Sequence, residues 1–190
     1  MPGNHQSGQK NHEPGVPTAD TVWMTGLSGA GKSTLADVLA RMLRREGRPC
    51  IVLDGDAVRE GLSRGLGFSD ADRLENMRRV AEVARLANDS GVIAIVALIS
   101  PLEEGRRLAR RIVGTQRFIE VHVSTPIEIC ARRDPKGLYA GAHAGKVTAF
   151  TGVSSAYEVP ASPDLRVDTS VLSAQECAMQ MRERLQPWLG

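Results

Sequence analysis

The sequence has few aromatic residues and no long hydrophobic run, and both shortages limit what the chain can be. Only 4% of its 190 residues are aromatic, so aliphatic side chains must form most of the core, and a hydrophobic content of 42% is sufficient for one. The longest apolar run, residues 92–99, is far shorter than the roughly 20 residues that a membrane-spanning helix needs. These observations predict one globular domain that does not cross a membrane.

Charge and cysteine usage exclude further classes of protein. With 24 basic and 22 acidic residues the net charge is +2, which gives no reason to expect a broad basic face for nucleic acid. The three cysteines, Cys50, Cys130 and Cys177, are far apart and show no zinc-site spacing, which favours a reducing compartment. Residues 1–20 lack the apolar stretch of a signal peptide, and we expect them to form a disordered tail of a cytoplasmic protein.

Short β-branched runs alternate with segments of helical spacing along the rest of the chain. This alternation predicts an α/β fold in which a five-stranded parallel sheet is flanked by helices and binds ligands beyond the carboxyl ends of its strands. The expected strands are residues 21–25, 50–54, 92–100, 117–124 and 165–169. The expected helices are residues 32–46, 70–90, 101–113, 127–132 and 173–185.

One segment, about residues 133–164, breaks this alternation. It is rich in Gly, Pro, Ala and Lys and has few periodic apolar positions. A stretch of this length without clear secondary structure is commonly a lid or a linker. Because a strand follows it, we expect a mobile lid within a single domain that spans residues 21–190.

A phosphate-binding loop follows the first expected strand. Residues 25–34 read T-G-L-S-G-A-G-K-S-T and satisfy G-x-x-x-x-G-K-[ST], in which backbone N–H groups and a helix N-terminus cradle phosphates. Lys32 is expected to reach the β- and γ-phosphates of ATP, and Ser33 to bind Mg²⁺. A Gly-rich turn that merely caps a helix is the weaker interpretation, and no N-K-x-D motif suggests a GTPase. The expected ATP-binding residues of the loop are Gly26, Leu27, Ser28, Gly29, Ala30, Gly31, Lys32, Ser33 and Thr34.

Two acids follow the second expected strand in the string L-D-G-D-A-V-R, residues 53–59. A carboxylate there can accept the proton of a sugar hydroxyl, while the other, or the same one, orients Mg²⁺. Arg59 lies one helical turn after Asp56 and is placed to bind an anionic acceptor. Helix capping is the alternative role of either Asp54 or Asp56, because Asp is common at helix N-termini.

The string G-F-S-D-A-D-R-L-E-N-M-R-R, residues 67–79, has little apolar content to bury. We expect Asp70 to cap a helix on which Arg73 and Asn76 share one face and present a cation and an amide to a ligand. Phe68, just before the cap, is placed to stack on a base. Together these residues suit a second nucleotide that carries an anionic group.

An equally weighted interpretation makes the same helix face solvated and ion-paired. Glu75 and Arg79 are spaced to pair at i, i+4. The position that continues the ligand-facing row is then either Arg79 or Val80. Spacing alone leaves both interpretations open.

Taken in order, these strings resemble adenylylsulfate kinase, which phosphorylates the 3′-hydroxyl of adenosine 5′-phosphosulfate (APS) to give 3′-phosphoadenosine 5′-phosphosulfate (PAPS). The resemblance covers nearly the whole chain, from about Val22 to the C-terminal helix. Further matching strings are I-S-P at 99–101, R-D-P-K-G-L-Y at 133–139, F-T-G at 150–152 and Y-E-V-P at 157–160.

The resemblance implies a role for residues on both sides of the site. Phe68 and Phe150 would sandwich the adenine of APS, Asp56 would be the base with Asp54 its partner toward Mg²⁺, and Arg133 would contact ATP. The implied catalytic residues are Asp56, Asp54, Lys32 and Ser100, and the implied metal ligands are Ser33 and Asp54. The implied substrate-binding residues are Arg59, Phe68, Arg73, Asn76, Ile99, Ser100, Lys136, Gly137, Leu138 and Phe150. A homodimer, and an ATP sulfurylase that supplies APS, are also implied.

Ser100 has two further interpretations. Members of the family are commonly described with a phosphoserine at this I-S-P position, yet direct in-line transfer between two bound substrates needs no phosphoenzyme. A strand-end serine could also cap a helix that begins at Pro101. We favour a residue that lines the acceptor pocket.

Several positions depart from the family pattern, all on the acceptor and lid side. They are Ala57 for Asn, Leu102 for an aromatic residue or His, Glu103 for Arg, Gly141 for Lys, His143 for Arg, Val153 for Ile and Ser154 for Asp. The departures keep two alternatives open: a related P-loop kinase with a different small hydroxyl acceptor, and a nucleotide-sensing module without turnover.

Overall fold

Five parallel strands form the centre of the molecule. The computed structural model describes residues 19–146 and 150–185, apart from the side chain of His143. The strands pair in the order β2-β3-β1-β4-β5, so the predicted five-stranded parallel sheet is confirmed. Their bounds are β1 Thr21–Thr25, β2 Cys50–Asp54, β3 Ile93–Ala97, β4 Phe118–Val123 and β5 Leu165–Val167.

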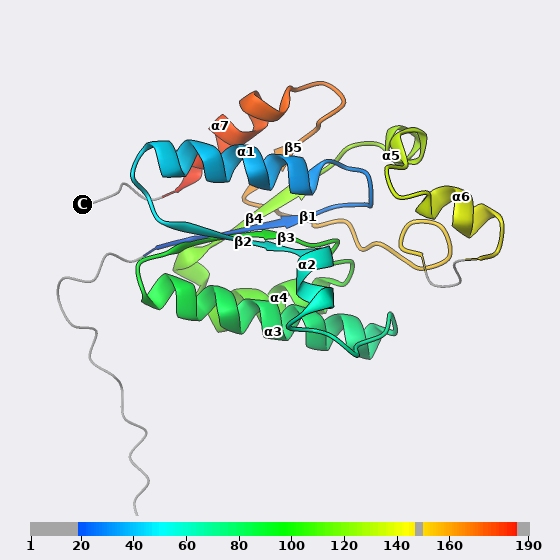
Figure 1. The fold of residues 1–190 in the computed structure, drawn as a ribbon, viewed down its shortest axis with the longest axis horizontal. Coiled ribbons are helices and arrows are strands. Elements are labelled where there is room, and N and C mark those ends of the chain that lie inside the picture. The colour runs from blue at the N-terminus through cyan, green and yellow to red at the C-terminus, as the bar shows by residue number, and fades with distance from the viewer. Residues whose placement is uncertain (1–18, 147–149, 186–190) are drawn as a thin grey trace, which may run out of the picture.

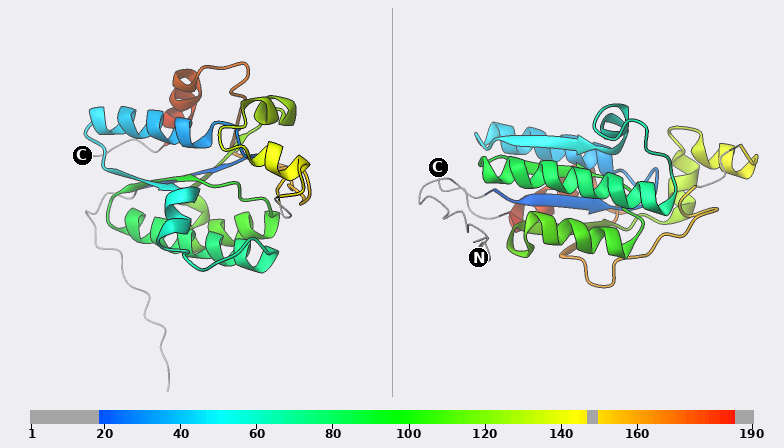
Figure 2. Two further views of the ribbon diagram at one scale, coloured as in Figure 1. Left: turned by 45° about the vertical axis from the view of Figure 1, so that its right-hand side comes forward. Right: turned by 90° about the horizontal axis from the view of Figure 1, so that it is seen from below.

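Helices cover both faces of the sheet (Figure 1). The helices α1 (Lys32–Arg45) and α7 (Ala174–Arg184) pack on one face, and α3 (Asp70–Asp89) and α4 (Glu103–Val113) on the other. The further helical segments are α2 Gly55–Glu60, η1 Thr115–Arg117, α5 Ile127–Arg133 and α6 Leu138–His143. Figure 2 shows α5 and α6 beyond the carboxyl ends of the strands, where such sheets bind their ligands.

The core follows from the two periodicities of the sequence. Residues of β1 alternate between the sheet faces, so Met24 joins the cluster under α1 while Trp23 joins the cluster under α3 and α4. On α1, Leu35, Leu39 and Leu43 recur at i, i+4 and i+8 and are fully buried. Because helices cover both faces, every residue of β1 and β3 is buried.

Element boundaries differ from the expectation mainly where a residue turns the chain sharply. The strand β3 ends at Ala97 and α4 begins at Glu103, and Ser100 lies between them with a left-handed φ of 46°. The cap of α3 is Ser69 rather than Asp70, since the Ser69 hydroxyl accepts from the Asp72 amide at 3.2 Å. The six-residue helices α2 and α6 were not predicted, because one and a half turns are too short to show a helical period.

The ends of the domain only partly test the predicted organisation. Residues 1–18 of the expected tail lie outside the described residues, whereas Ala19 and Asp20 are buried, so the packed domain begins before residue 21. The expected lid, 133–164, contains α6 and is described apart from residues 147–149; its mobility stays a prediction. Among the helices that the structure describes, none is long and apolar enough to span a membrane.

Candidate active site

The predicted phosphate loop joins β1 to α1 at the carboxyl edge of the sheet, and two of its glycines are required by close approach. A Cβ atom at Gly26 would lie 2.5 Å from the carbonyl oxygen of Val123. At Gly29, where φ is +77°, a Cβ atom would lie 2.7 Å from the carbonyl oxygen of Cys130. Only glycine lets the loop pack this closely against the end of β4 and against α5.

Lys32 is buried at the base of this loop. Its ammonium donates hydrogen bonds to the carbonyl oxygens of Gly26 at 2.8 Å and Leu27 at 2.7 Å. Burial lowers the pKa of Lys32 to about 8, against the opposing effect of Cys130. The loop therefore holds a single desolvated cation, which suits an anionic ligand such as the phosphates of ATP.

The serine of the loop and the two predicted acids form a connected group. The Ser33 hydroxyl donates to Asp54 Oδ2 at 2.6 Å, while Asp54 Oδ1 accepts from the Asp56 amide at 3.0 Å. Asp54 therefore caps α2, as the capping alternative predicts, and also contacts the phosphate loop. Asp56 lies in the first turn of α2 with an exposed carboxylate.

Three residues from the start of the predicted lid contact this group or the phosphate loop. The Lys136 ammonium forms an ion pair with the Asp56 carboxylate. Arg133 donates to the carbonyl oxygen of Gly29 at 3.3 Å and to the Thr169 hydroxyl at 2.7 Å. Tyr139 donates to the carbonyl oxygen of Ser28 at 3.1 Å, and burial raises its pKa to about 12. The structure thus brings Arg133 and Lys136 to the phosphate loop and the acids.

The aromatic and arginines of the second predicted site also lie together. The Arg59 guanidinium carbon lies 4.4 Å from the centroid of the Phe68 ring, which is 59% exposed. Arg73 donates to the carbonyl oxygen of Phe68 at 2.8 Å and to the Thr151 hydroxyl at 2.7 Å. This bond to Thr151 connects the 67–79 string to the F-T-G string.

Asn76 and Phe150 are placed differently from Phe68. The Asn76 side chain is buried, and its Oδ1 accepts no hydrogen bond from the part of the chain that the structure describes. Phe150 is only 5% exposed and packs edge-on against Tyr139, with ring centroids 4.8 Å apart. The adenine sandwich between Phe68 and Phe150 stays a prediction.

The ion-paired interpretation applies to one face of α3, whereas the ligand-binding role of its buried face stays a prediction. Arg73, Asn76 and Val80 are buried on one face. Glu75 pairs with Arg79 at 2.8 Å and with Arg78, and these hydrogen bonds lower the pKa of Glu75 to about 2. Val80 rather than Arg79 therefore continues the buried row.

The I-S-P turn lies between β3 and α4. Ser100 is 2% exposed, and its hydroxyl accepts from the Trp23 indole N–H at 2.9 Å instead of capping α4. The Thr25 hydroxyl donates to the carbonyl oxygen of Ile99 at 2.7 Å, and the Gly26 amide donates to the same oxygen at 3.3 Å. The turn is thereby fastened to the phosphate loop; the catalytic and binding roles of Ser100 stay predictions.

Beside this turn, His122 at the end of β4 is buried without a hydrogen bond to Nδ1 from any described residue. Burial, with the charges of Arg166 and Arg106, lowers the pKa of His122 to about 4.

This lowered pKa of His122 predicts a stability that depends on pH. The unfolded chain takes up a proton below about pH 6.5 that the folded chain resists, so the free energy of unfolding falls as the pH drops toward 4. We expect the free energy of unfolding to fall by about 2–3 kcal/mol across this window from His122. Urea unfolding at several pH values should show a shallower fall in His122→Gln; equal slopes would contradict it.

Sequence reasoning missed several residues that hold the site together. Tyr139, Thr151 and Tyr157 stand within the quoted strings K-G-L-Y, F-T-G and Y-E-V-P, so their positions were marked without a role. The Tyr157 hydroxyl lies 2.9 Å from the Thr25 hydroxyl. Thr169 has no local signal, because only the fold brings it to Arg133.

Three of the residues that depart from the family pattern can be placed by their local contacts or exposure. Glu103 pairs with Arg107 within α4 at 3.9 Å, and the Ser154 hydroxyl accepts from the Phe150 amide at 2.9 Å. Ala57 is exposed on α2. The side chain of His143 lies outside the described residues.

The predicted Mg²⁺ site fits the residues present. Within the described ranges, no group of three or more His, Cys, Asp and Glu side chains could hold a metal. Mg²⁺ in nucleotide sites commonly takes only one or two protein oxygens and completes its shell with water and phosphate. The adjacent oxygens of Ser33 and Asp54 are donors of this kind.

Comparison with known proteins gives the same family as the resemblance of the sequence strings. The family model described as adenylylsulphate kinase matches residues 18–168. The chain belongs to the adenylylsulphate kinase family. It is 51% identical to an adenylyl-sulfate kinase of Bacteroides thetaiotaomicron over 87% of this chain and 83% of that one. It is also 49% identical to the bifunctional enzyme NodQ of Rhizobium meliloti, of which it spans only 28% while 97% of this chain is covered.

Among solved structures, this adenylylsulphate kinase family member is similar to the Mycobacterium tuberculosis APS kinase CysC in complex with AMPPNP and APS. The TM-score is 0.85 and the identity 48%, with 88% of this chain and 97% of the other covered. The predicted family and P-loop kinase fold are therefore confirmed.

Proposed function

We propose that the protein transfers the γ-phosphoryl group of ATP to the 3′-hydroxyl of APS, giving PAPS and ADP. The observation that carries the proposal is the position of the Asp54–Asp56 group. It contacts the phosphate loop through Ser33 and is followed by Arg59, which lies on the Phe68 ring of the second predicted nucleotide site. The similarity to a structure that holds both AMPPNP and APS supports the same pair of substrates.

The chemistry of each residue follows from its place. Lys32 neutralises charge on the β- and γ-phosphates, and the loop amides hold them in line with the acceptor. Asp56 accepts the proton of the 3′-hydroxyl as the oxygen attacks. Arg59 and Arg73 hold the anionic head group of APS, and Phe68 stacks on the adenine. The Asn76 amide oxygen, which has no partner among the described residues, accepts a hydrogen bond from the nucleotide.

Mg²⁺ would be held by Ser33 and Asp54, and it would supply neutralisation of phosphate charge when bound. The pair of Lys136 with Asp56 ties the predicted lid to the proposed base. A homodimer, a cytoplasmic location and an ATP sulfurylase that supplies APS are parts of the proposal that rest on the family resemblance.

The reaction is tested by incubating the purified protein with Mg-ATP, with and without APS, and analysing the products by mass spectrometry. We expect PAPS and ADP in equal amounts, and only when APS is present. No PAPS from a protein that still binds ATP would point to another hydroxyl acceptor, which a panel of nucleosides and sugars would identify. No turnover with any acceptor would leave a nucleotide-sensing module.

The stacking role of Phe68 predicts a selective loss. We expect Phe68→Ala to raise the KM for APS by roughly 10–100-fold, because base stacking on an aromatic side chain is worth about 1–3 kcal/mol. The KM for ATP should change by less than about twofold, since Phe68 lies outside the phosphate loop. The control is Leu86→Ala, which removes an exposed apolar side chain on α3. An equal rise in both KM values would contradict the role.

A further inference from the structure

The I-S-P turn has a backbone conformation that its own sequence does not favour. Ser100 has a φ of 46°, in the left-handed region that residues other than glycine adopt uncommonly. Such conformations persist only where surrounding contacts hold them. Ser100 is 2% exposed, so protein groups and not solvent must supply those contacts.

One of these groups is a buried arginine outside the site described so far. Arg106 on α4 is 2% exposed, and its Nη1 donates to the carbonyl oxygen of Ser100 at 2.8 Å. Two uncharged contacts act beside it: Trp23 donates to the Ser100 hydroxyl at 2.9 Å, and the Thr25 hydroxyl, which donates to Ile99, also lies 3.2 Å from the Ser100 carbonyl oxygen. Arg106 therefore supplies the charge-assisted bond of the three, which is the strongest type.

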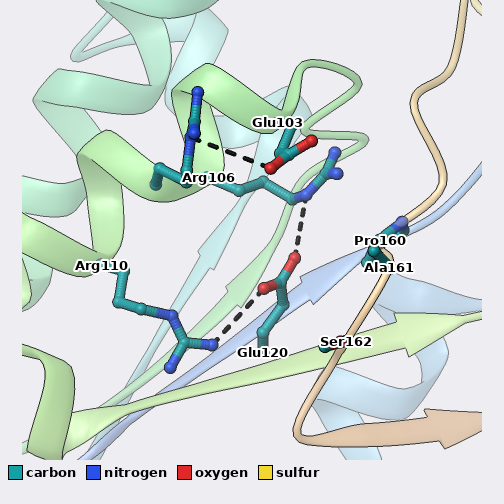
Figure 3. A pocket seen from close by; sticks show the side chains of 8 residues that line it. Glu103, Arg106, Arg110, Glu120, Pro160, Ala161 and Ser162 are labelled. Carbon is teal, nitrogen blue, oxygen red and sulfur yellow. Dashed lines mark hydrogen bonds and ion pairs between the residues drawn. The ribbon is translucent and has the colours of Figure 1, made fainter.

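The Arg106 guanidinium is itself oriented by a carboxylate on the neighbouring strand. Its Nε lies 2.9 Å from Oε1 of Glu120, a β4 residue whose side chain is 13% exposed. The other Glu120 oxygen lies 3.4 Å from Arg110 Nη2, which also pairs with Asp164 at 2.7 Å. Glu120 thus holds Arg106 through an ion pair, and Figure 3 shows the two side chains meeting across the space between α4 and β4.

We propose that Arg106, oriented by Glu120, is a positioning residue for the phosphoryl acceptor. It holds the carbonyl oxygen of Ser100 and thereby the left-handed turn in which Ile99 and Ser100 line the acceptor pocket. The inference rests on the proposed function, because it is the acceptor APS whose binding the turn shapes. The arginine touches neither substrate in this proposal and acts only through the turn.

Arg106 contacts Glu120 and the Ser100 carbonyl oxygen through different nitrogens, which makes Arg106→Lys the informative variant. Lysine keeps the buried positive charge beside Glu120, but a single ammonium lacks the planar fork that reaches both Glu120 and the Ser100 carbonyl oxygen. We expect the KM for APS to rise about tenfold or more. The KM for ATP should stay within about twofold, since the phosphate loop holds its ligand through its own amides and Lys32.

The structure offers a matched control and a route for chemical rescue. Arg107 is the next residue on α4, is 67% exposed and pairs only within its helix with Glu103 among the described residues, so Arg107→Met should leave both KM values unchanged. Arg106 also lines an open pocket of about 270 Å³ between α4, β4 and residues 160–162. Millimolar guanidinium chloride can therefore reach the position vacated in Arg106→Ala.

The experiment measures both KM values for the wild type and the variants, with thermal unfolding alongside. A higher KM for APS alone in Arg106→Lys, with guanidinium but not equal sodium chloride lowering it in Arg106→Ala, supports the proposal. Unchanged KM values in Arg106→Lys, or an equal rise in both without rescue, would overturn it and leave a purely structural ion pair. A wild type that makes no PAPS would instead refute the proposed function itself.

Discussion

Replacing Asp56 with asparagine is expected to lower kcat for APS phosphorylation by roughly 10²–10⁴-fold, the usual range for the loss of a general base. An amide cannot accept the proton of the 3′-hydroxyl, although it keeps the shape of the side chain. The affinity for ATP should change little, because Asp56 lies on α2 and makes its ion pair with Lys136 rather than with the phosphate loop. Steady-state kinetics and an ATP titration measure the two quantities.

A control for this variant is available on the same short helix. Glu60 is also an exposed acid on α2, so Glu60→Gln changes the helix charge equally without touching the proposed base. We expect its kcat to equal that of the wild type. A kcat in Asp56→Asn within about threefold of the wild type would move the proton acceptor elsewhere, and Asp54 would be the next candidate.

Replacing Lys32 with methionine is expected to lower kcat/KM by roughly 10²–10³-fold, as the loss of one preorganised charge-stabilising donor does in other enzymes. The ammonium is buried at the base of the loop and is the charge placed to follow the transferred phosphoryl group. Because the same interaction acts in the ground state, the KM for ATP should rise as well. Initial rates at several ATP concentrations measure both effects.

The melting temperature of Lys32→Met distinguishes a loss of catalysis from a loss of folding. Burial lowers the pKa of Lys32 to about 8, so the folded protein holds this charge at a cost. An apolar side chain of similar length removes that cost, and Lys32→Met should melt at the same temperature as the wild type or higher. Arg41→Met, at an exposed position on α1, is the control. Full activity in Lys32→Met would contradict the assignment of the loop.

The two sets of predictions address different parts of the site. Asp56 and Lys32 concern the chemical step, whereas Phe68 and Arg106 concern the acceptor. A protein that loses kcat through Asp56 but shows no APS-specific change through Phe68 would have the proposed chemistry and a different acceptor. This outcome is the one that the departures at Leu102 and Glu103 keep open.

Much of the fold could be predicted because its signals are local. The alternation of strands and helices requires only neighbouring residues, and β1, β2 and α1 were predicted within one residue at each end. The loop glycines and Lys32 form one continuous string whose chemistry depends on backbone turns within it. Asp54 could be placed on the same side of the sheet as Ser33, since the carboxyl ends of all strands in a parallel sheet lie at one edge.

The remainder could not be predicted because it depends on contacts between distant parts of the chain. The bond of Arg73 to Thr151 spans 78 residues and that of Arg133 to Thr169 spans 36. Ser100 was expected to continue a strand or cap a helix, yet three side chains from other elements hold it in a left-handed turn. No local preference of serine favours that conformation.

The sequence by itself therefore determined the parallel sheet, the phosphate loop and the identity of the acids beside it, because periodicity and short motifs act over a few residues. The tertiary structure alone decided which helix face of α3 is buried, how the predicted lid meets Asp56, and how Arg106 contacts both Glu120 and the I-S-P turn. Those features arise from burial and charge pairing between segments that are brought together only when the sheet and its helices have packed.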